Sequence, residues 1–327
     1  MKPPYEFVSN DAQLIQAERF AYTEGRAKGT EGCRIENGKL GFTVLVDRCL
    51  DIYDLRFSGK LISYLSETGV VHPAYYEAHG SGWLRSFCAG FLTTCGLTQA
   101  GEPCAFGGEA HGLHGRISNI PAQNVAVSYE REGGQFSFCI SGEVRQTCHQ
   151  KENLVLRRRI RTRYGTDTLV IEDEIRNEGA SSSPLMLLYH FNFGYPFLCG
   201  RTTLSLPPAL PRGFDKYSEQ HKDLYNEFGR SAMDRELTLV HELLHRGETC
   251  FHITDGETSI RFSYDNTHLP YIAQWRHLFE KSYVLGVEPC NNHINGVAWE
   301  ADHGALKWIE PGAAIANKFD IEFSEAK

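Results

Sequence analysis

Thr168-Leu169-Val170-Ile171-Glu172-Asp173-Glu174-Ile175 is the stretch of the sequence that decides the fold class. Every second residue, from Leu169 to Ile175, falls on one face of an extended chain, because successive side chains of a strand point to opposite sides. Gly165 precedes the stretch and Asn177-Glu178-Gly179 follows it, and both are turn signals. The stretch therefore predicts a β-strand with one face, including Asp173, turned towards the core.

The same alternation recurs along most of the chain, between short turns rich in Gly, Asn and Asp. Further strands are predicted at residues 39–45, 125–130, 135–144, 259–264, 282–288 and 316–323. Helical periodicity is scarce, with short candidates at residues 11–17, capped by Asn10 or Asp11, and at 215–235. Many strands without β-α alternation indicate an all-β fold, a large antiparallel β-sandwich with few short helices. We expect a single domain over residues 1–327, with a loop-rich insertion near 205–240.

The charge balance argues against two classes of partner. The 327 residues carry 33 basic and 41 acidic side chains, for a net charge of -8. This acidic balance does not provide the excess of positive charge that binds nucleic acid or an anionic membrane surface, so neither is expected as a partner. Arginines at positions 157, 158, 159, 161 and 163 form a basic run, but acidic residues follow at 172–174. Because the run alternates as a strand does, we interpret it as a solvated sheet face.

The ten cysteines do not suggest a disulfide framework. No C-x-x-C pair occurs, the first residues lack the apolar core of a signal peptide, and no later run is long enough to span a bilayer. We therefore expect a soluble, cytoplasmic protein with reduced thiols. Cys88, Cys95, Cys139 and Cys250 have apolar neighbours in the sequence and are expected to be small core residues.

The first candidate site segment is His111-Gly112-Leu113-His114-Gly115-Arg116. Glycines beside a histidine permit a close backbone approach and leave the ring accessible. A turn histidine bonded to a nearby carbonyl explains the segment equally well. The H-x-x-H spacing suits two metal ligands only if the chain bends, because positions i and i+3 of a strand face opposite sides.

Two apolar strands carry polar residues in unusual places. His190 and Asn192 share one face of the strand Leu187-Leu188-Tyr189-His190-Phe191-Asn192-Phe193, and aromatic residues surround them. Glu288 ends the apolar run that begins at Tyr283, where a buried carboxylate is costly unless it has a function or a partner. Burial would raise the pKa of this carboxyl towards the range of a general base. An ion pair with an arginine is the structural alternative for Glu288.

Other segments offer weaker candidates. Arg85, between Trp83 and Phe87, suits hydrogen bonds to sugar hydroxyls while an aromatic face packs on the sugar ring, or equally an ion pair with Glu288. Gln274 and Trp275 suit contact with a sugar face, although packing at an exposed edge explains them nearly as well. In Asp47-Arg48-Cys49-Leu50-Asp51-Ile52 we favour a structural salt bridge. The sequence contains no G-x-S-x-G, Walker or G-x-G-x-x-G motif.

The order of these clusters resembles that of the galactose mutarotase-like superfamily, which includes the aldose 1-epimerases. The resemblance covers nearly the whole chain and is carried by Leu113-His114-Gly115, Tyr189-His190-Phe191-Asn192 and Val287-Glu288-Pro289. An uncharacterised branch of these proteins is also similar in its D-R-x-L-D-I and T-C-G-L elements, which stand here at residues 47–52 and 94–97.

The resemblance implies an isomerase that interconverts sugar anomers without a metal or other cofactor. It implies Glu288 as the base, His190 as the acid and His114 as a further catalytic residue. The expected substrate-binding residues are Arg85, His111, Asn192, Gln274 and Trp275. The expected partner is a small sugar or sugar derivative, and a homodimer remains open.

Two alternatives stay open at this point. One is an isomerase or epimerase acting at carbon, with a metal held by His111, His114, His190 or Glu288. The other is a sugar-binding or regulatory protein without catalytic activity. The sequence does not identify the sugar, or decide whether it carries a phosphate, carboxylate or sulfonate group.

Overall fold

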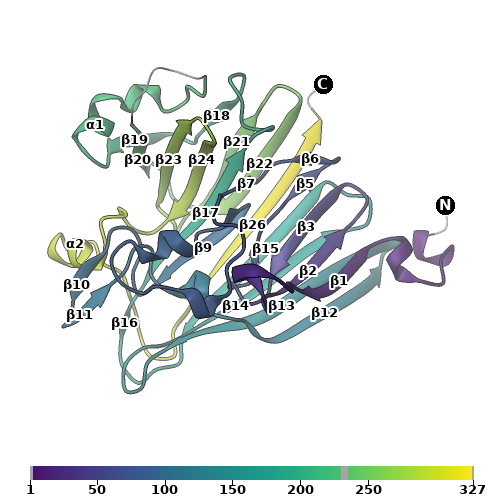
Figure 1. The fold of residues 1–327 in the computed structure, drawn as a ribbon, viewed down its shortest axis with the longest axis horizontal. Coiled ribbons are helices and arrows are strands. Elements are labelled where there is room, and N and C mark those ends of the chain that lie inside the picture. The colour runs from purple at the N-terminus through teal and green to yellow at the C-terminus, as the bar shows by residue number, and fades with distance from the viewer. Residues whose placement is uncertain (1–2, 230–234, 326–327) are drawn as a thin grey trace.

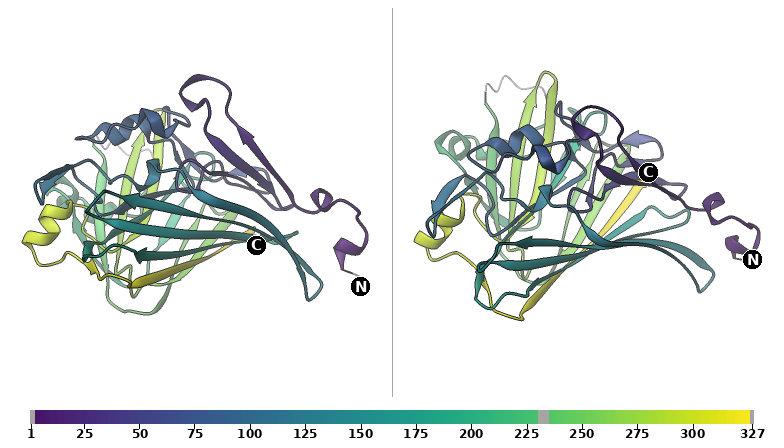
Figure 2. Two further views of the ribbon diagram at one scale, coloured as in Figure 1. Left: turned by 90° about the horizontal axis from the view of Figure 1, so that it is seen from below. Right: turned by 60° about the horizontal axis from the view of Figure 1, so that its bottom comes forward.

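Two large antiparallel β-sheets pack face to face in the computed structural model, which describes residues 3–229 and 235–325. Figure 1 shows the strands of both sheets running across the molecule, and Figure 2 shows the sheets as two layers. The predicted β-sandwich is therefore confirmed. The prediction of a single domain over the whole chain stays a prediction. Among the described residues, no helix is both long and apolar enough to cross a bilayer.

The larger sheet has twelve strands within the described residues. In spatial order it contains β1 (Gln16–Ala21), β2 (Glu31–Glu36), β3 (Leu40–Leu45), β4 (Asp51–Ile52), β9 (Leu92–Leu97), β17 (Met186–Gly194), β24 (Ser282–Cys290), β23 (Tyr271–Phe279), β20 (Leu237–Leu243) and β19 (Ala209–Gly213). Two short strands extend from β3, namely β5 (Arg56–Phe57) and β6 (Lys60–Leu61).

The second sheet has eight strands within the described residues and contains the longest strands of the fold. Its order is β12 (Gln123–Glu132), β13 (Gln135–Thr147), β14 (Asn153–Arg163), β15 (Thr168–Asn177), β26 (Ala314–Glu325), β22 (Thr258–Asp265), β21 (Glu248–Thr254) and β18 (Thr203–Ser205). All seven strands predicted from the sequence lie in these two sheets.

Smaller elements complete the fold. Three two-stranded ladders pair β7 (Tyr64–Leu65) with β8 (Ala89–Gly90), β10 (Cys104–Phe106) with β11 (Glu109–His111), and β16 (Ser183–Pro184) with β25 (Trp308–Ile309). The α-helices are α1 (Lys216–Gln220) and α2 (Val297–Asp302). Short 3-10 turns lie at Pro4–Glu6, Asp11–Gln13, Gly25–Ala27, Pro73–Tyr75, Gly82–Ser86, Ile117–Asn119 and Lys222–Leu224. Both α-helices and the β10–β11 ladder lie on the left of Figure 1.

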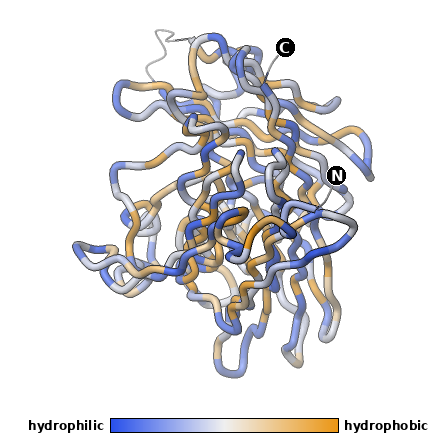
Figure 3. Tube along the Cα trace, turned by 90° about the vertical axis from the view of Figure 1, so that its right-hand side faces the viewer, coloured by the Kyte–Doolittle hydropathy of each residue, from blue (hydrophilic) through white to orange (hydrophobic). Residues whose placement is uncertain are grey.

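The main hydrophobic core lies between the two sheets, where alternating residues of each strand meet. β15 buries positions 169, 171, 173, 175 and 177 and leaves the intervening residues more exposed, as its period predicts. Figure 3 shows hydrophobic segments gathered inside the molecule and hydrophilic hairpin tips at its lower end. All ten cysteines are described and none forms a disulfide. Cys88 and Cys95 are buried as expected, whereas Cys139 and Cys250 are only half-buried.

Arg158 is an exception to the prediction that the arginine run forms a solvated sheet face. Its side chain is fully buried and donates to Asp51 Oδ1 at 2.9 Å and to Asp173 at 2.9 and 2.7 Å. Tyr189 donates to the same Asp173 carboxylate at 2.9 Å, and Asp51 also accepts from the backbone and hydroxyl of Thr94. The predicted structural ion pair of Asp51 is therefore made with Arg158 rather than with Arg48. It joins β4, β9, β14, β15 and β17 inside the core.

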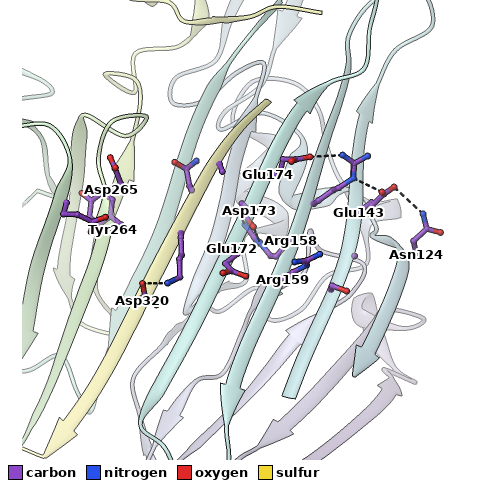
Figure 4. A pocket seen from close by; sticks show the side chains of 17 residues that line it. Asn124, Glu143, Arg158, Arg159, Glu172, Asp173, Glu174, Tyr264, Asp265 and Asp320 are labelled. Atoms are coloured by element: carbon purple, nitrogen blue, oxygen red, sulfur yellow. Dashed lines mark hydrogen bonds and ion pairs between the residues drawn. The ribbon is translucent and has the colours of Figure 1, made fainter. Parts of the chain in front are cut away.

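The neighbouring arginines lie on the outer face of the smaller sheet, as predicted. Arg157 donates to Glu143 and Glu174, each at 2.9 Å, and Lys318 pairs with Asp320 at 2.8 Å (Figure 4). These charges alternate in sign across adjacent strands and line a hollow of about 730 Å³. Opposite charges on cross-strand neighbours stabilise a sheet modestly, which accounts for the basic run without a nucleic-acid partner.

The two helix candidates are much shorter than predicted. Asn10 caps the first turn by accepting from the backbone of Ala12 at 3.0 Å, but the chain enters β1 at Gln16, because pairing with β2 replaces the helix. In the second region only α1 is α-helical, and residues 230–234 lie outside the described residues. The expected insertion near 205–240 contains β19 and the start of β20, so part of it belongs to the larger sheet.

Candidate active site

Strand register brings His190 and Glu288 side by side on the outer face of the larger sheet. On β17 and β24, Phe191 is paired with Val287, which places His190 directly across from Glu288. Thr93 of β9 lies on the other side of His190, and Ala273 of β23 lies on the other side of Glu288. Residues far apart in the sequence thus form one row across four strands, with their side chains on the face opposite the main core.

The carboxylate and the imidazole of this pair are in contact. Nε2 of His190 lies 3.2 Å from Oε1 of Glu288, and both side chains are almost fully buried. Gly286 makes room for them, because a Cβ there would stand 3.0 Å from Cε1 of His190 and would collide with Oε1 of Glu288. Nδ1 of His190 and Oε1 of Glu288 are buried without a hydrogen-bond partner. Unsatisfied polar atoms are costly inside a protein, so these atoms are available to a polar ligand.

His114 reaches the pair from a loop. Its backbone is left-handed, with φ at 56°, and is held by hydrogen bonds from His114 N to Gly101 O at 2.9 Å and from Gly96 N to His114 O at 3.1 Å. A Cβ at Gly115 would collide with backbone oxygens of Gly96 and Gln99, which explains the glycine after the histidine. The centroid of the His114 ring lies 5.9 Å from that of His190.

Aromatic side chains form the walls around these three groups. Trp83 lies 4.7 Å from the His114 ring, while Phe87 and Trp275 lie 5.5 and 5.8 Å from the His190 ring, measured between centroids. The cavity measures about 270 Å³, enough for a small ligand such as a monosaccharide. It is lined by Ser81, Trp83, Leu84, Phe87, Gly101, Glu102, Leu113, His114, His190, Phe214, Glu236, Thr238, Trp275, Glu288 and Ile294.

Burial favours the neutral form of all three titratable groups, so it raises the pKa of the carboxyl group and lowers the pKa of both histidines. Desolvation raises the pKa of Glu288 to about 8. Desolvation, and then the neighbouring His114, lowers the pKa of His190 well below its usual value, although the side chain of Asn192 opposes this shift. Desolvation alone lowers the pKa of His114 to about 4. Between these limits the Glu288–His190 pair holds one proton.

The structure brings some of the predicted site residues together and leaves others apart. Glu288, His190, His114 and Trp275 line one cavity. Asn192 lies beside His190 but is fully buried, and its Nδ2 donates to the carbonyls of Gly90 and His190 at 3.1 and 2.9 Å. It therefore supports the histidine from behind.

Besides Asn192, three further predicted contact residues do not line the cavity. Arg85 is exposed and pairs with Glu77 at 3.2 Å, so it does not hold Glu288 either. His111 lines a different hollow, where its Nε2 lies 3.3 Å from the carbonyl of Phe106. Gln274 points to the opposite face of the sheet from Trp275 and is bonded to His241 and Tyr225. Period-two geometry separates neighbours on a strand, which is why Gln274 and Trp275 cannot share a face.

Sequence reasoning did not assign Glu102, Phe214, Glu236 or Thr238 to the site. They come from loops and strand ends that only tertiary packing brings to the cavity, and no local pattern marks them. Trp83 and Phe87, the aromatic neighbours of Arg85 that were expected to pack on a sugar ring, line the wall, whereas the arginine does not. Among the described residues, no three His, Cys, Asp or Glu side chains converge in a way that could hold a metal ion.

Solved structures share this fold over nearly the whole chain. The first is from Klebsiella pneumoniae and is named a "putative aldose 1-epimerase"; it is 23% identical, covers 97% of this chain and 86% of its own, and has a TM-score of 0.88. A galactose mutarotase-like protein from Clostridium acetobutylicum is 13% identical. The match covers 95% of this chain and 98% of that protein, with a TM-score of 0.67. Another galactose mutarotase-like protein, from Lactobacillus casei, is 12% identical. The match covers 90% of this chain and 100% of that protein, with a TM-score of 0.57.

At these identities the similarity establishes the fold alone, a galactose mutarotase-like β-sandwich, which is the fold that the resemblance implied. No curated protein matches the sequence significantly. Residues 27–323 match the sequence profile of a family described as a domain of unknown function, DUF4432. Because this match spans most of its length, the chain belongs to the DUF4432 family.

Proposed function

We propose that this protein is an aldose 1-epimerase-type isomerase that interconverts the anomers of a sugar. The observation that carries the proposal is the buried Glu288–His190 pair, with its atoms 3.2 Å apart and unsatisfied polar atoms in an aromatic-walled cavity. Aromatic faces pack against the apolar faces of sugar rings, while a paired carboxylate and imidazole serve proton transfer. The fold shared with mutarotase-like proteins supports the same reaction class.

The reaction needs only two proton transfers. Glu288, as a carboxylate, removes the proton of the hydroxyl at C1, and those electrons form the C1 carbonyl as the bond from C1 to the ring oxygen breaks. His190, protonated, donates its Nε2 proton to that ring oxygen. Rotation about the C1–C2 bond and the reverse transfers then close the ring on the other face. Atoms and charge balance within the pair, and a positioned acid or base typically contributes about 10²–10⁴-fold.

The single proton of the pair accounts for both roles. In the empty site the raised pKa of Glu288 and the lowered pKa of His190 keep this proton on the carboxyl group. Hydrogen bonds from sugar hydroxyls stabilise the carboxylate, so the proton passes to His190 as the sugar binds. Asn192 favours the protonated histidine. Its anchored amide is therefore assigned to positioning His190.

His114 is assigned to hydrogen bonding rather than proton transfer, because its pKa of about 4 keeps it neutral. The backbone N–H of Gly101 donates to Nδ1 of His114 at 3.4 Å, so the ring proton resides on Nε2. That N–H can donate to a sugar oxygen as charge develops on it during ring opening.

Exchange spectroscopy by NMR on a panel of hexoses and pentoses tests this function directly. We expect the purified protein to accelerate exchange between the α and β signals of at least one sugar at least tenfold above the buffer rate. Conversion to a ketose or to a C2 epimer would instead identify isomerisation at carbon. Saturable sugar binding without faster exchange would identify a sugar-binding protein and contradict the proposal.

The pH dependence of the rate follows from the proton count of the pair. Because burial raises the pKa of Glu288, the last proton leaves the pair only above about pH 8, and the acid is then lost. Because burial lowers the pKa of His190, the pair takes up a second proton only at a pH well below the usual pKa of histidine. Both groups are then protonated, and Glu288 no longer acts as the base. We expect kcat/KM to fall about tenfold per unit above pH 8 and to stay level down to pH 6. A rate that rises through pH 8 would contradict the one-proton pair.

A further inference from the structure

The charges that line the proposed sugar cavity are all acidic. Glu102 and Glu236 stand exposed at its mouth, whereas the buried Glu288 shares one proton with His190, so that this pair carries no net charge. In the empty site its two histidines are neutral near pH 7, because burial lowers both pKa values. None of the described residues that line the cavity is an arginine or a lysine. An anionic group on a sugar would therefore meet carboxylates and find no cation to pair with.

Several arginines of the surrounding elements contact other partners and do not line the cavity; Arg235, next to Glu236 in the sequence, packs over the ring of Tyr217 at 5.7 Å. Arg48 is buried and donates to the carbonyls of Ser118, Val71 and Ser86 at 2.7 to 2.9 Å, which fixes the turn that carries Trp83. Arg85 follows Trp83 in that turn but pairs with Glu77 outside the cavity. A further arginine, Arg212, packs over the ring of Trp299 at 5.4 Å. Reassigning any of them to a substrate anion would require breaking these contacts.

Glu236 is held in place at the cavity mouth. Its Oε2 accepts from the indole N–H of Trp275 at 2.9 Å, which links the carboxylate to an aromatic wall of the cavity. This hydrogen bond places the carboxylate at the edge of the indole ring, and a fixed carboxylate at the cavity mouth suits a cationic group because opposite charges attract. Oε1 of Glu288 lies 3.2 Å from Nε2 of His190 but has no hydrogen-bond partner, which indicates a ligand that donates a hydrogen bond in the same cavity.

We propose that this site selects a sugar carrying a free amino group and rejects sugars carrying a phosphate, carboxylate or sulfonate. This inference rests on the proposed function for its reaction. Its physical basis is the sign of the charge at the cavity, where opposite charges attract and like charges repel over several ångströms. The ammonium group of the sugar lies against Glu236, while C1 and the ring oxygen face Glu288 and His190.

A matched series of sugars tests the selection at about pH 6.5, where a sugar amine is mostly protonated. The series contains glucose and galactose, their 2-amino-2-deoxy derivatives, their 6-phosphates and their uronic acids. We expect kcat/KM to be at least tenfold higher for an amino sugar than for its parent, and at least tenfold lower for each anionic derivative. Added salt should narrow both ratios, because it screens exposed charges.

Glu236→Gln and Glu242→Gln form a matched pair of variants. Glu242 is also exposed and lies on the adjoining strand β20, but it does not line the cavity. We expect Glu236→Gln to cut the ratio of amino sugar to parent sugar at least fivefold, whereas Glu242→Gln keeps the wild-type ratio. Loss of all activity in Glu236→Gln would be resolved by measuring the same ratio as binding, by titration calorimetry.

Two results would overturn the inference: a sugar phosphate or uronate turned over as well as its parent, or an amino sugar no better than its parent. If no sugar is equilibrated at all, the proposed function fails instead. Saturation-transfer NMR with the same series then decides the charge selection, because it measures binding without turnover. Equal binding of amino and anionic derivatives would contradict it, and preferential binding of the amino sugar would support it.

Discussion

Glu288→Gln is expected to reduce enzymatic anomer exchange by about 10²–10⁴-fold, the range of a lost general base. Glutamine keeps the size of the side chain and can still accept a hydrogen bond, but it cannot take the proton from the C1 hydroxyl. Since sugar binding relies on the whole cavity, KM should change much less than kcat. The exchange rate, measured by NMR and corrected for buffer, checks both parameters.

The thermal stability of Glu288→Gln is the control that shows whether the variant is folded. Burial raises the folded-state pKa of Glu288 to about 8, above its ordinary value of 4.5. The wild-type protein therefore loses stability as pH rises between these values, because the unfolded chain releases the proton first. Glutamine carries no such cost, so Glu288→Gln should have the higher Tm at about pH 9, with a smaller difference at about pH 5. Full exchange activity in a folded variant would remove Glu288 as the base.

Arg158→Met is expected to destabilise the fold by about 3–5 kcal/mol, the usual cost of removing one partner from a buried ion pair. Arg158 is fully buried, and its loss leaves the carboxylates of Asp51 and Asp173 without their cation. Burial already raises the pKa of Asp51 to about 6 even though Arg158 opposes the shift. Denaturant unfolding measures the loss directly.

Two comparisons show whether this loss comes from the buried charge. Arg159→Met changes the next residue, whose side chain is exposed, and should shift stability by no more than about 0.5 kcal/mol. Arg158→Lys retains the charge but loses the forked hydrogen bonds, so we expect an intermediate loss. The cost of Arg158→Met should also shrink from about pH 8 to pH 5, because Asp51, whose pKa burial raises and Arg158 lowers, then takes up a proton in the folded variant. Equal losses of unfolding free energy in Arg158→Met and Arg159→Met would contradict a stabilising role for the buried Arg158 ion pairs.

Local patterns predicted the fold class because the alternation of buried and exposed positions in a strand is visible in consecutive residues. Residues 168–175 became part of β15 with the predicted buried face, and the other six predicted strands also formed. The same local reasoning failed where pairing competes with local preference. Around Asn10 the cap formed but the helix did not continue, because Gln16 onwards pairs with β2.

The candidate site was predictable in part for the same reason. His190 and Asn192 share a face by period-two geometry, and the glycine after His114 indicated a close backbone approach that the structure contains. Arg85 and Gln274 were assigned to the sugar only because of their neighbours in the sequence. The structure turns Arg85 towards Glu77 and Gln274 towards the opposite face.

By itself the sequence determined the alternating strands, the order of the histidines and Glu288 along the chain, and the charge balance. Only the tertiary structure decided that His190 and Glu288 are cross-strand neighbours, that Arg158 is a core residue, and that Glu236 stands beside Trp275. The physical reason is that alternation depends on neighbouring residues, whereas register and burial depend on pairing between distant strands. The raised pKa of Glu288 belongs to the second group, because desolvation exists only once the sheets and loops have closed around it.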